Sequence, residues 1–138
     1  MKKFENFSNA LKAFENAGAQ DLDNEFIQGG IINKFSLQFE LSWKLLKYLL
    51  AYEGDTVAAS GSPRGIIKAA YRYYDFIDEA VWLEMLRDRN TITHIYDSNQ
   101  AKELITRIID TYIPEFQKIR ESLLDRYGSM LTAPDVGR

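Results

Sequence analysis

Residues 25–53 read EFIQGGIINKFSLQFELSWKLLKYLLAYE, and the fold can be argued outward from this stretch. Its apolar residues recur at helical spacing but cover more than one side of the predicted helix, whereas a surface helix carries a single apolar stripe. A helix of this kind normally lies at the centre of a bundle or packs against a partner as well. The stretch therefore predicts an all-α fold around one long helix, which Gly54 ends.

A shorter amphipathic helix is predicted before the long one. Apolar residues recur at spacings of three and four from Phe4 to about Ala17, and Gly18 follows as a stop signal. The segment after it is polar, and Asp21 and Asp23 could each cap the long helix.

Three further helices are predicted after the long one. Residues 55–61 form a linker of small residues, and Ser62 followed by proline is typical of a helix start. Asp78 begins a second helix, and residues 98–127 keep helical register to form the last. Pro114 lies in the middle of that last helix and should kink it.

These elements make about five helices around a four-helix-bundle core in one domain, residues 1–128. Residues 129–138 have little to bury, so we expect a disordered or loosely held tail.

The composition narrows the possible functions. The chain of 138 residues has no cysteine and one histidine, which excludes disulfides and thiolate metal sites and argues against a zinc site built from protein ligands. No cofactor is expected. No apolar run approaches the roughly 20 residues that cross a bilayer, so we expect a soluble, cytoplasmic protein. The net charge of −3 gives no general attraction for nucleic acid, and RNA binding would need a local basic patch.

The residues most able to carry chemistry are gathered in residues 87–96, RDRNTITHIY, which include the only histidine. Three β-branched residues, 91–93, disfavour helix, and Asp97 with Gln100 resembles a capping box that opens the next helix. The preceding helix should therefore fray near Asn90. Arg89 and His94, which would diverge on a regular helix, could then turn toward a common point.

A guanidinium beside an imidazole suits phosphodiester chemistry, since arginine stabilises charge on phosphate oxygens and histidine moves protons. Metal-free RNA cleavage through the 2′-hydroxyl uses both a base and an acid, and a symmetric dimer would supply two histidines. Other interpretations stay open. His94 could be a capping residue, the Arg-Asp-Arg run a solvated face, and Tyr96 a hydrophobic staple on Ala101.

Several blocks together resemble a known family. Residues 89–94, RNTITH, resemble the motif of HEPN domains, in which a histidine follows an arginine after one polar and three variable residues, and residues 94–96, HIY, complete its His-x-Tyr form. Residues 39–47, 62–64 and 82–86 resemble the branch called nucleotidyltransferase substrate-binding proteins. The similarity covers about residues 4–127.

The resemblance implies an up-and-down helical bundle that forms a homodimer and pairs with a minimal nucleotidyltransferase acting as antitoxin, in a type VII-like toxin–antitoxin system. Relatives act as metal-independent ribonucleases on RNA, silenced when the partner adds AMP to the motif tyrosine (AMPylation). On this chain the resemblance implies that Arg89 holds phosphate, His94 transfers protons, Asn90 supports the site and Tyr96 accepts the nucleotide. Arg87 is an auxiliary basic residue without a role fixed by the motif.

Two alternatives lie outside catalysis. The chain could be a non-catalytic subunit that presents a substrate to its nucleotidyltransferase, which its acidity allows. It could also be a plain helical scaffold, which would tolerate loss of His94 with a change in stability only.

Overall fold

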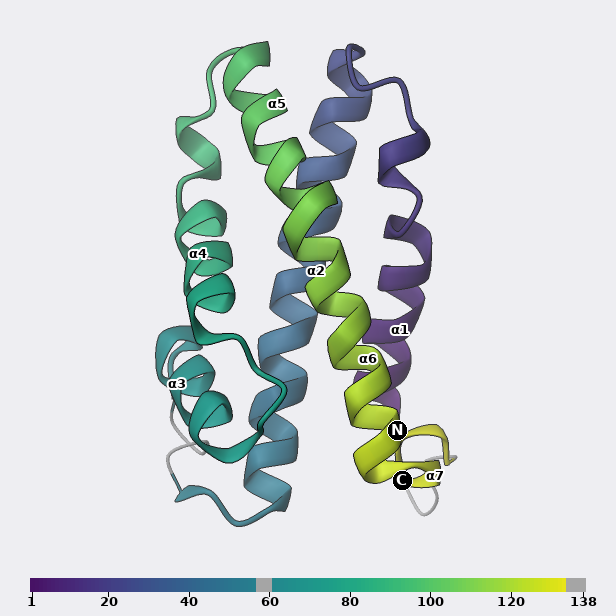
Figure 1. Cartoon of the computed structure of the whole chain (residues 1–138), viewed down its shortest axis with the longest axis vertical. Coiled ribbons are helices and arrows are strands. Elements are labelled where there is room, and N and C mark those ends of the chain that lie inside the picture. The colour runs from purple at the N-terminus through teal and green to yellow at the C-terminus, as the bar shows by residue number, and fades with distance from the viewer. Residues whose placement is uncertain (57–60, 134–138) are drawn as a thin grey trace.

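The computed structural model describes residues 1–56 and 61–133, and every regular element within these two ranges is a helix (Figure 1). The predicted all-α fold is confirmed. The α-helices are α1 (Lys2–Phe14), α2 (Glu25–Tyr52), α3 (Pro63–Tyr73), α4 (Glu79–Asn90), α5 (Ser98–Arg107), α6 (Ile113–Tyr127) and α7 (Ser129–Thr132). Short 3-10 turns at Ala17–Ala19 and Ile92–His94 and a π-helical turn at Ile108–Tyr112 lie between them.

The chain runs up and down in rows of helices, and the row of α5 and α6 crosses in front of α2 at an angle (Figure 1). Helix α1 and the long α2 form two rows, α3 and α4 share the third, and α5 continues into α6 to form the fourth. Helix α2 contacts α1, α3, α4 and α5, so it is the central helix that the sequence predicts. None of the helices in the described part of the chain combines the length and the apolar character needed to cross a bilayer.

The core is built mainly on α2. Phe35 and Phe39 are fully buried on this helix. The Phe39 ring lies 6.2 Å from the Trp82 ring of α4, and the Trp82 ring lies 5.7 Å from Phe116 of α6, between ring centroids. The Trp82 indole N–H donates to Glu115 at 3.0 Å, which satisfies the one polar atom of this buried side chain. Three rows of the bundle therefore meet around one aromatic cluster.

Local signals place most helix starts correctly. Ser62, Asp78 and Asp97 each cap the helix that follows, accepting a hydrogen bond from the backbone N–H three residues later at 3.3, 3.3 and 2.8 Å. The cap of α2 is Asn24 rather than Asp21 or Asp23, and its side chain accepts from the N–H groups of residues 26 and 27.

Two predicted helices are less regular than expected. Helix α1 ends at Phe14 rather than near residue 17, and a separate 3-10 turn contains Gly18. The last helix is interrupted by the π-helical turn Ile108–Tyr112, directly before Pro114 in the first turn of α6. Proline disturbs the hydrogen-bond ladder of the preceding turn, so the expected distortion is found just ahead of the proline.

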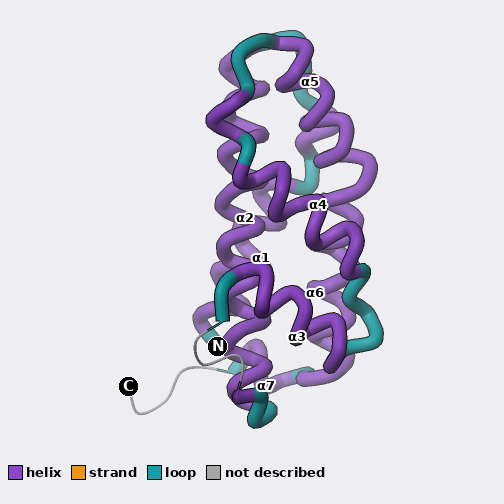
Figure 2. Tube along the Cα trace, turned by 90° about the vertical axis from the view of Figure 1, so that its left-hand side faces the viewer, coloured by secondary structure: helices purple, strands orange, loops and turns teal. Residues whose placement is uncertain are grey.

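The tail differs from the prediction over its first residues. Ser129–Thr132 form α7, and Leu131 is fully buried. The Met1 amino group donates to the carbonyls of Leu131 and Ala133, both at 2.9 Å, and Figure 2 shows α7 beside the start of α1. A single leucine packed into the bundle end therefore orders the chain to Ala133, and residues 134–138 of the expected tail lie outside the described residues.

Candidate functional site

The candidate site lies where α4 gives way to α5. Helix α4 ends at Asn90, one 3-10 turn follows, and Asp97 then caps α5. The hydroxyl of Thr91 donates to the carbonyls of Arg87 and Asp88, at 3.1 and 3.2 Å, which satisfies acceptors at the helix end. The predicted break near Asn90 is thus confirmed, and it comes from the β-branched run that disfavours helix.

Arg89 is held against the central helix. Its Nη1 pairs with the carboxylate of Glu40 on α2, its Nε donates to the Asn90 side chain at 3.2 Å, and its guanidinium lies 5.3 Å from the centre of the Phe39 ring. Burial of the Glu40 carboxyl opposes ionisation, but contacts with Trp43 and Arg89 outweigh it and hold the pKa of Glu40 below its usual value. The carboxylate stays charged and fixes the guanidinium, while Nη2 makes no hydrogen bond within the described residues.

His94 and Tyr96 form an exposed pair. The Nδ1 atom of His94 lies 3.3 Å from the Tyr96 hydroxyl, and the two rings meet edge to face with 71° between their planes. The Tyr96 N–H donates to the side chain of Gln100 at 2.7 Å, while Asp97 caps the same helix turn. Tyr96 remains 79% exposed, so it buries too little surface for a staple on Ala101. The cap therefore holds the backbone of a tyrosine whose phenol faces solvent.

The structure joins these residues in two separate pairs. Arg89 contacts Asn90, and His94 contacts Tyr96. Among the described residues, no hydrogen bond or ion pair links one pair to the other. Within a single chain, the arginine is thus anchored on the bundle and the histidine stands on the connecting loop.

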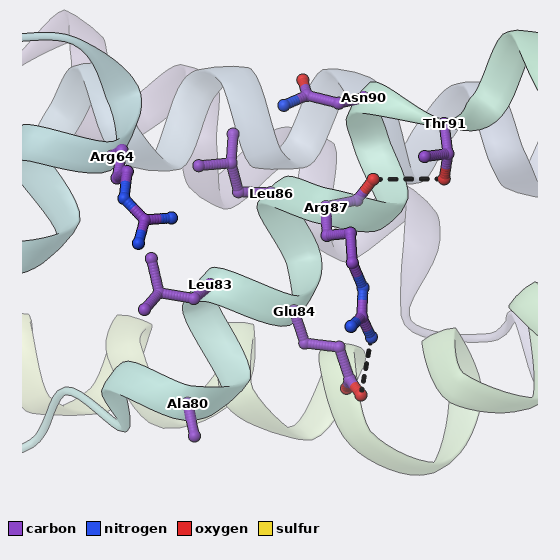
Figure 3. Close-up of a pocket in the computed structure, with 8 residues that line it drawn as sticks. All are labelled: Arg64, Ala80, Leu83, Glu84, Leu86, Arg87, Asn90 and Thr91. Carbon is purple, nitrogen blue, oxygen red and sulfur yellow. Dashed lines mark hydrogen bonds and ion pairs between the residues drawn. The ribbon is translucent and has the colours of Figure 1, made fainter.

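Arg87 points away from Arg89, as expected for residues two apart on a helix. It is 70% exposed and approaches the Glu84 carboxylate at 3.7 Å. With Asn90, Thr91 and Arg64 of α3 it lines a groove of about 610 Å³ (Figure 3).

Asp88, between the two arginines, is the residue that the sequence interpretation missed. Its side chain is 7% exposed, and it accepts two hydrogen bonds from Arg107, at 2.8 and 3.0 Å, and one from the Tyr112 hydroxyl. Hydrogen bonding to Asp88 raises the pKa of Arg107, and burial together with Asp88 raises that of Tyr112. The Arg-Asp-Arg run is therefore not simply a solvated face. Asp88 lies three residues after the buried Met85, and this helical spacing indicates that Asp88 faces the core.

The described residues hold no group of three histidine, aspartate or glutamate side chains placed to bind a metal ion.

Comparison with protein families matches residues 2–125 to the family described as "Nucleotidyltransferase substrate binding protein like". The match includes the whole candidate site. No curated protein matches the chain.

Proposed function

The chain belongs to the nucleotidyltransferase substrate binding protein-like family, and from this membership we propose that it is a metal-independent RNA endonuclease silenced by its partner nucleotidyltransferase at Tyr96. In this proposal the protein is the HEPN toxin of a type VII-like toxin–antitoxin pair. The observation that carries it is the exposed contact between the His94 imidazole and the Tyr96 phenol, with Arg89 fixed at the neighbouring helix end.

Cleavage in this proposal takes place at a twofold dimer interface with one His94 from each protomer. One imidazole takes the proton of a 2′-hydroxyl, whose oxygen attacks the adjacent phosphorus. The other imidazole protonates the departing 5′-oxygen, which leaves a 2′,3′-cyclic phosphate. Arg89 steadies the charge on the phosphate oxygens through Nη2, while Asn90 and Glu40 hold the guanidinium in place. The exposed position of His94 supports this role, because its Nε2 makes no hydrogen bond within the described residues.

Silencing follows from the same contact. The Tyr96 hydroxyl attacks the α-phosphorus of ATP, pyrophosphate leaves, and the phenolic proton passes to Nδ1 of His94, 3.3 Å away. The product is a phosphodiester on the tyrosine. Its negative charge and its bulk lie beside the imidazole, so a substrate phosphate is kept away from His94.

A second candidate function has its own support. Arg89 is neutralised by Glu40, and the chain carries a net charge of −3, which does not attract RNA. Both observations favour a non-catalytic subunit that presents a substrate to the nucleotidyltransferase.

An assay of RNA cleavage in EDTA distinguishes the nuclease from the non-catalytic subunit. We expect purified protein to degrade RNA and His94→Ala to lose about 100-fold or more of the rate, as removal of a general acid–base group does. Thr93→Ala, in the same exposed turn, is the matched control and should keep full activity. Cleavage by His94→Ala at the normal rate would reject the nuclease assignment, and absence of cleavage by every variant would favour the substrate-binding subunit.

Mass spectrometry tests the modification. Incubation with the partner nucleotidyltransferase and ATP should add one or more AMP units to Tyr96, and Tyr96→Phe should remain unmodified. Tyr71→Phe removes another exposed phenol and should be modified normally. An adduct on any other residue contradicts the proposal.

A further inference from the structure

The groove between α3 and α4 adjoins the candidate site but has no part in the chemistry described above. It is lined by Arg64 of α3 and by residues of α4 and its C-terminal end, among them Leu83, Leu86, Arg87 and Asn90 (Figure 3). We call it the α3–α4 groove. Asn90 belongs to both places, since it lines the groove and accepts a hydrogen bond from Arg89.

The groove combines two guanidinium groups with little opposing charge. Arg64 is exposed and makes no ion pair or hydrogen bond with the part of the chain that the structure describes. Arg87 has one ion pair, with Glu84 at 3.7 Å, a weak contact for a side chain that is 70% exposed. Glu84 is the only acidic residue among those lining the groove, so the two arginines outweigh it. Their planar forks match the oxygens of a phosphate group.

The floor of the groove is apolar. Leu86 is nearly buried, and Leu83 is half-buried and packs against the core. Arg64 and both leucines line the same groove (Figure 3), so it combines a charged group with an apolar surface. A nucleotide presents the same combination, a flat base next to an anionic phosphate.

Arg64 is also held in position by its helix. Ser62 caps α3 by accepting from the Gly65 N–H at 3.3 Å, and Pro63 occupies the first turn. The start of the Arg64 side chain is therefore fixed relative to α4, which α3 contacts directly.

We propose that the α3–α4 groove binds a nucleotide of the RNA strand next to the one being cut, with its phosphodiester between Arg64 and Arg87 and its base against Leu83. This inference rests on the proposed function, which identifies the bound strand as RNA. Asn90 links the two positions along the strand, because it contacts Arg89 and also lines the groove.

Binding of an uncleavable strand tests the groove apart from the chemistry. A fluorescent 2′-O-methyl oligoribonucleotide has no free 2′-hydroxyl, so its anisotropy reports affinity whether or not the protein is a nuclease. Arg64→Ala should raise the Kd about fivefold or more and lower the slope of log K against log salt concentration by about 0.7, the value for one single-strand phosphate contact. Arg72→Ala, on the same helix but outside the groove, should change neither value.

The outcomes separate the two proposals. If the oligonucleotide binds tightly through Arg64 but the protein does not cleave RNA, the nuclease proposal is wrong and the groove is still a nucleotide-binding site. An Arg64→Ala variant with normal melting temperature, affinity and salt slope overturns the groove whatever the nuclease assay gives. AMP and ATP are tested as alternative ligands. If either binds through Arg64 and the oligonucleotide does not bind, the groove is not a site for an RNA strand.

Discussion

Asp88 shows how one buried carboxylate shapes the surface on both sides of it. The Asp88 carboxylate accepts hydrogen bonds from Arg107 and Tyr112 on the last row of the bundle, which clamps the end of α4. Its neighbours Arg87 and Arg89 are then directed to different places, one to the α3–α4 groove and the other to Glu40. We therefore regard Asp88 as a positioning residue of the candidate site.

Asp88→Asn should lower the free energy of unfolding by about 2–4 kcal/mol, because it leaves a partly buried guanidinium without its charge partner and replaces an acceptor with an amide. Urea denaturation followed by circular dichroism measures the change. Asp110→Asn, an exposed carboxylate on the π-helical turn, should stay within about 0.5 kcal/mol of the wild type. Equal stability of Asp88→Asn and Asp110→Asn would show that the buried contacts have no net effect.

At the start of α5, hydrogen bonds link the helix cap to the backbone of Tyr96. Asp97 accepts from the Gln100 N–H, and the Gln100 side chain in turn accepts from the Tyr96 N–H. In a standard capping box the Gln100 side chain would accept from the N–H of the cap residue, Asp97. Here it accepts from the N–H of Tyr96, one residue earlier.

Asp97→Ala should cost about 1 kcal/mol of stability, the usual effect of losing an N-cap, and should loosen the Tyr96 backbone. Amide hydrogen exchange should show faster exchange in the first turn of α5 and at residue 96. Asp21→Ala supplies the comparison, because Asp21 lies in a loop and does not cap α2. Unchanged protection at residues 96 and 100 would disprove the link between cap and loop.

A polar contact also joins α1 to α6, far apart in sequence. Glu15 accepts from Arg120, at 2.5 and 3.3 Å, and from Gln117 at 2.9 Å. The hydrogen bond from Arg120 is the main cause that holds the pKa of Glu15 below its usual value of 4.5, against the opposing effect of burial.

Because the folded pKa is the lower one, this contact stabilises the fold fully above pH 4.5 and loses its effect as the pH falls through the folded pKa. Glu15→Gln should therefore be about 1 kcal/mol less stable than the wild type at pH 7, and the gap should narrow toward pH 3. Urea titrations at several pH values measure it, with the exposed Glu121→Gln on α6 as the control. If the stability difference between Glu15→Gln and the wild type does not change with pH, the charge of Glu15 does not stabilise the fold.

The sequence predicts those features that depend on neighbours along the chain. Ser62, Asp78 and Asp97 are recognisable as caps because each bonds to a backbone group three residues away. The partners of Asp88 and Leu131 come from other rows of the bundle, so neighbouring residues in the sequence do not indicate them. The loop of the candidate site could be predicted, but the pairing of Arg89 with Glu40 joins positions 49 residues apart and no local pattern indicates it.

Large apolar side chains are exposed along one face of the long helix α2. Phe26 is 92% exposed and Leu37 53% exposed, and Tyr48 is also exposed. Spacings of eleven place all three on one side of a helix. The pocket that Tyr96 shares with Gly29 and Ile32 opens on another side of α2, where Ile32 is buried. A second copy covering the apolar face would bury apolar surface that a single chain leaves in water.

Light scattering at micromolar concentration should therefore give about twice the 15.9 kDa of one chain. Leu37→Glu puts a charge in the middle of the apolar face and should yield monomers, because an unpaired buried charge costs several kcal/mol. Leu124→Glu changes an exposed leucine of α6 in the same way and should leave the dimer intact. If cleavage needs one His94 from each protomer, Leu37→Glu should lose RNA cleavage together with the dimer. A wild-type protein that is monomeric yet cleaves RNA would contradict this prediction, since a single chain has one imidazole to act as both base and acid.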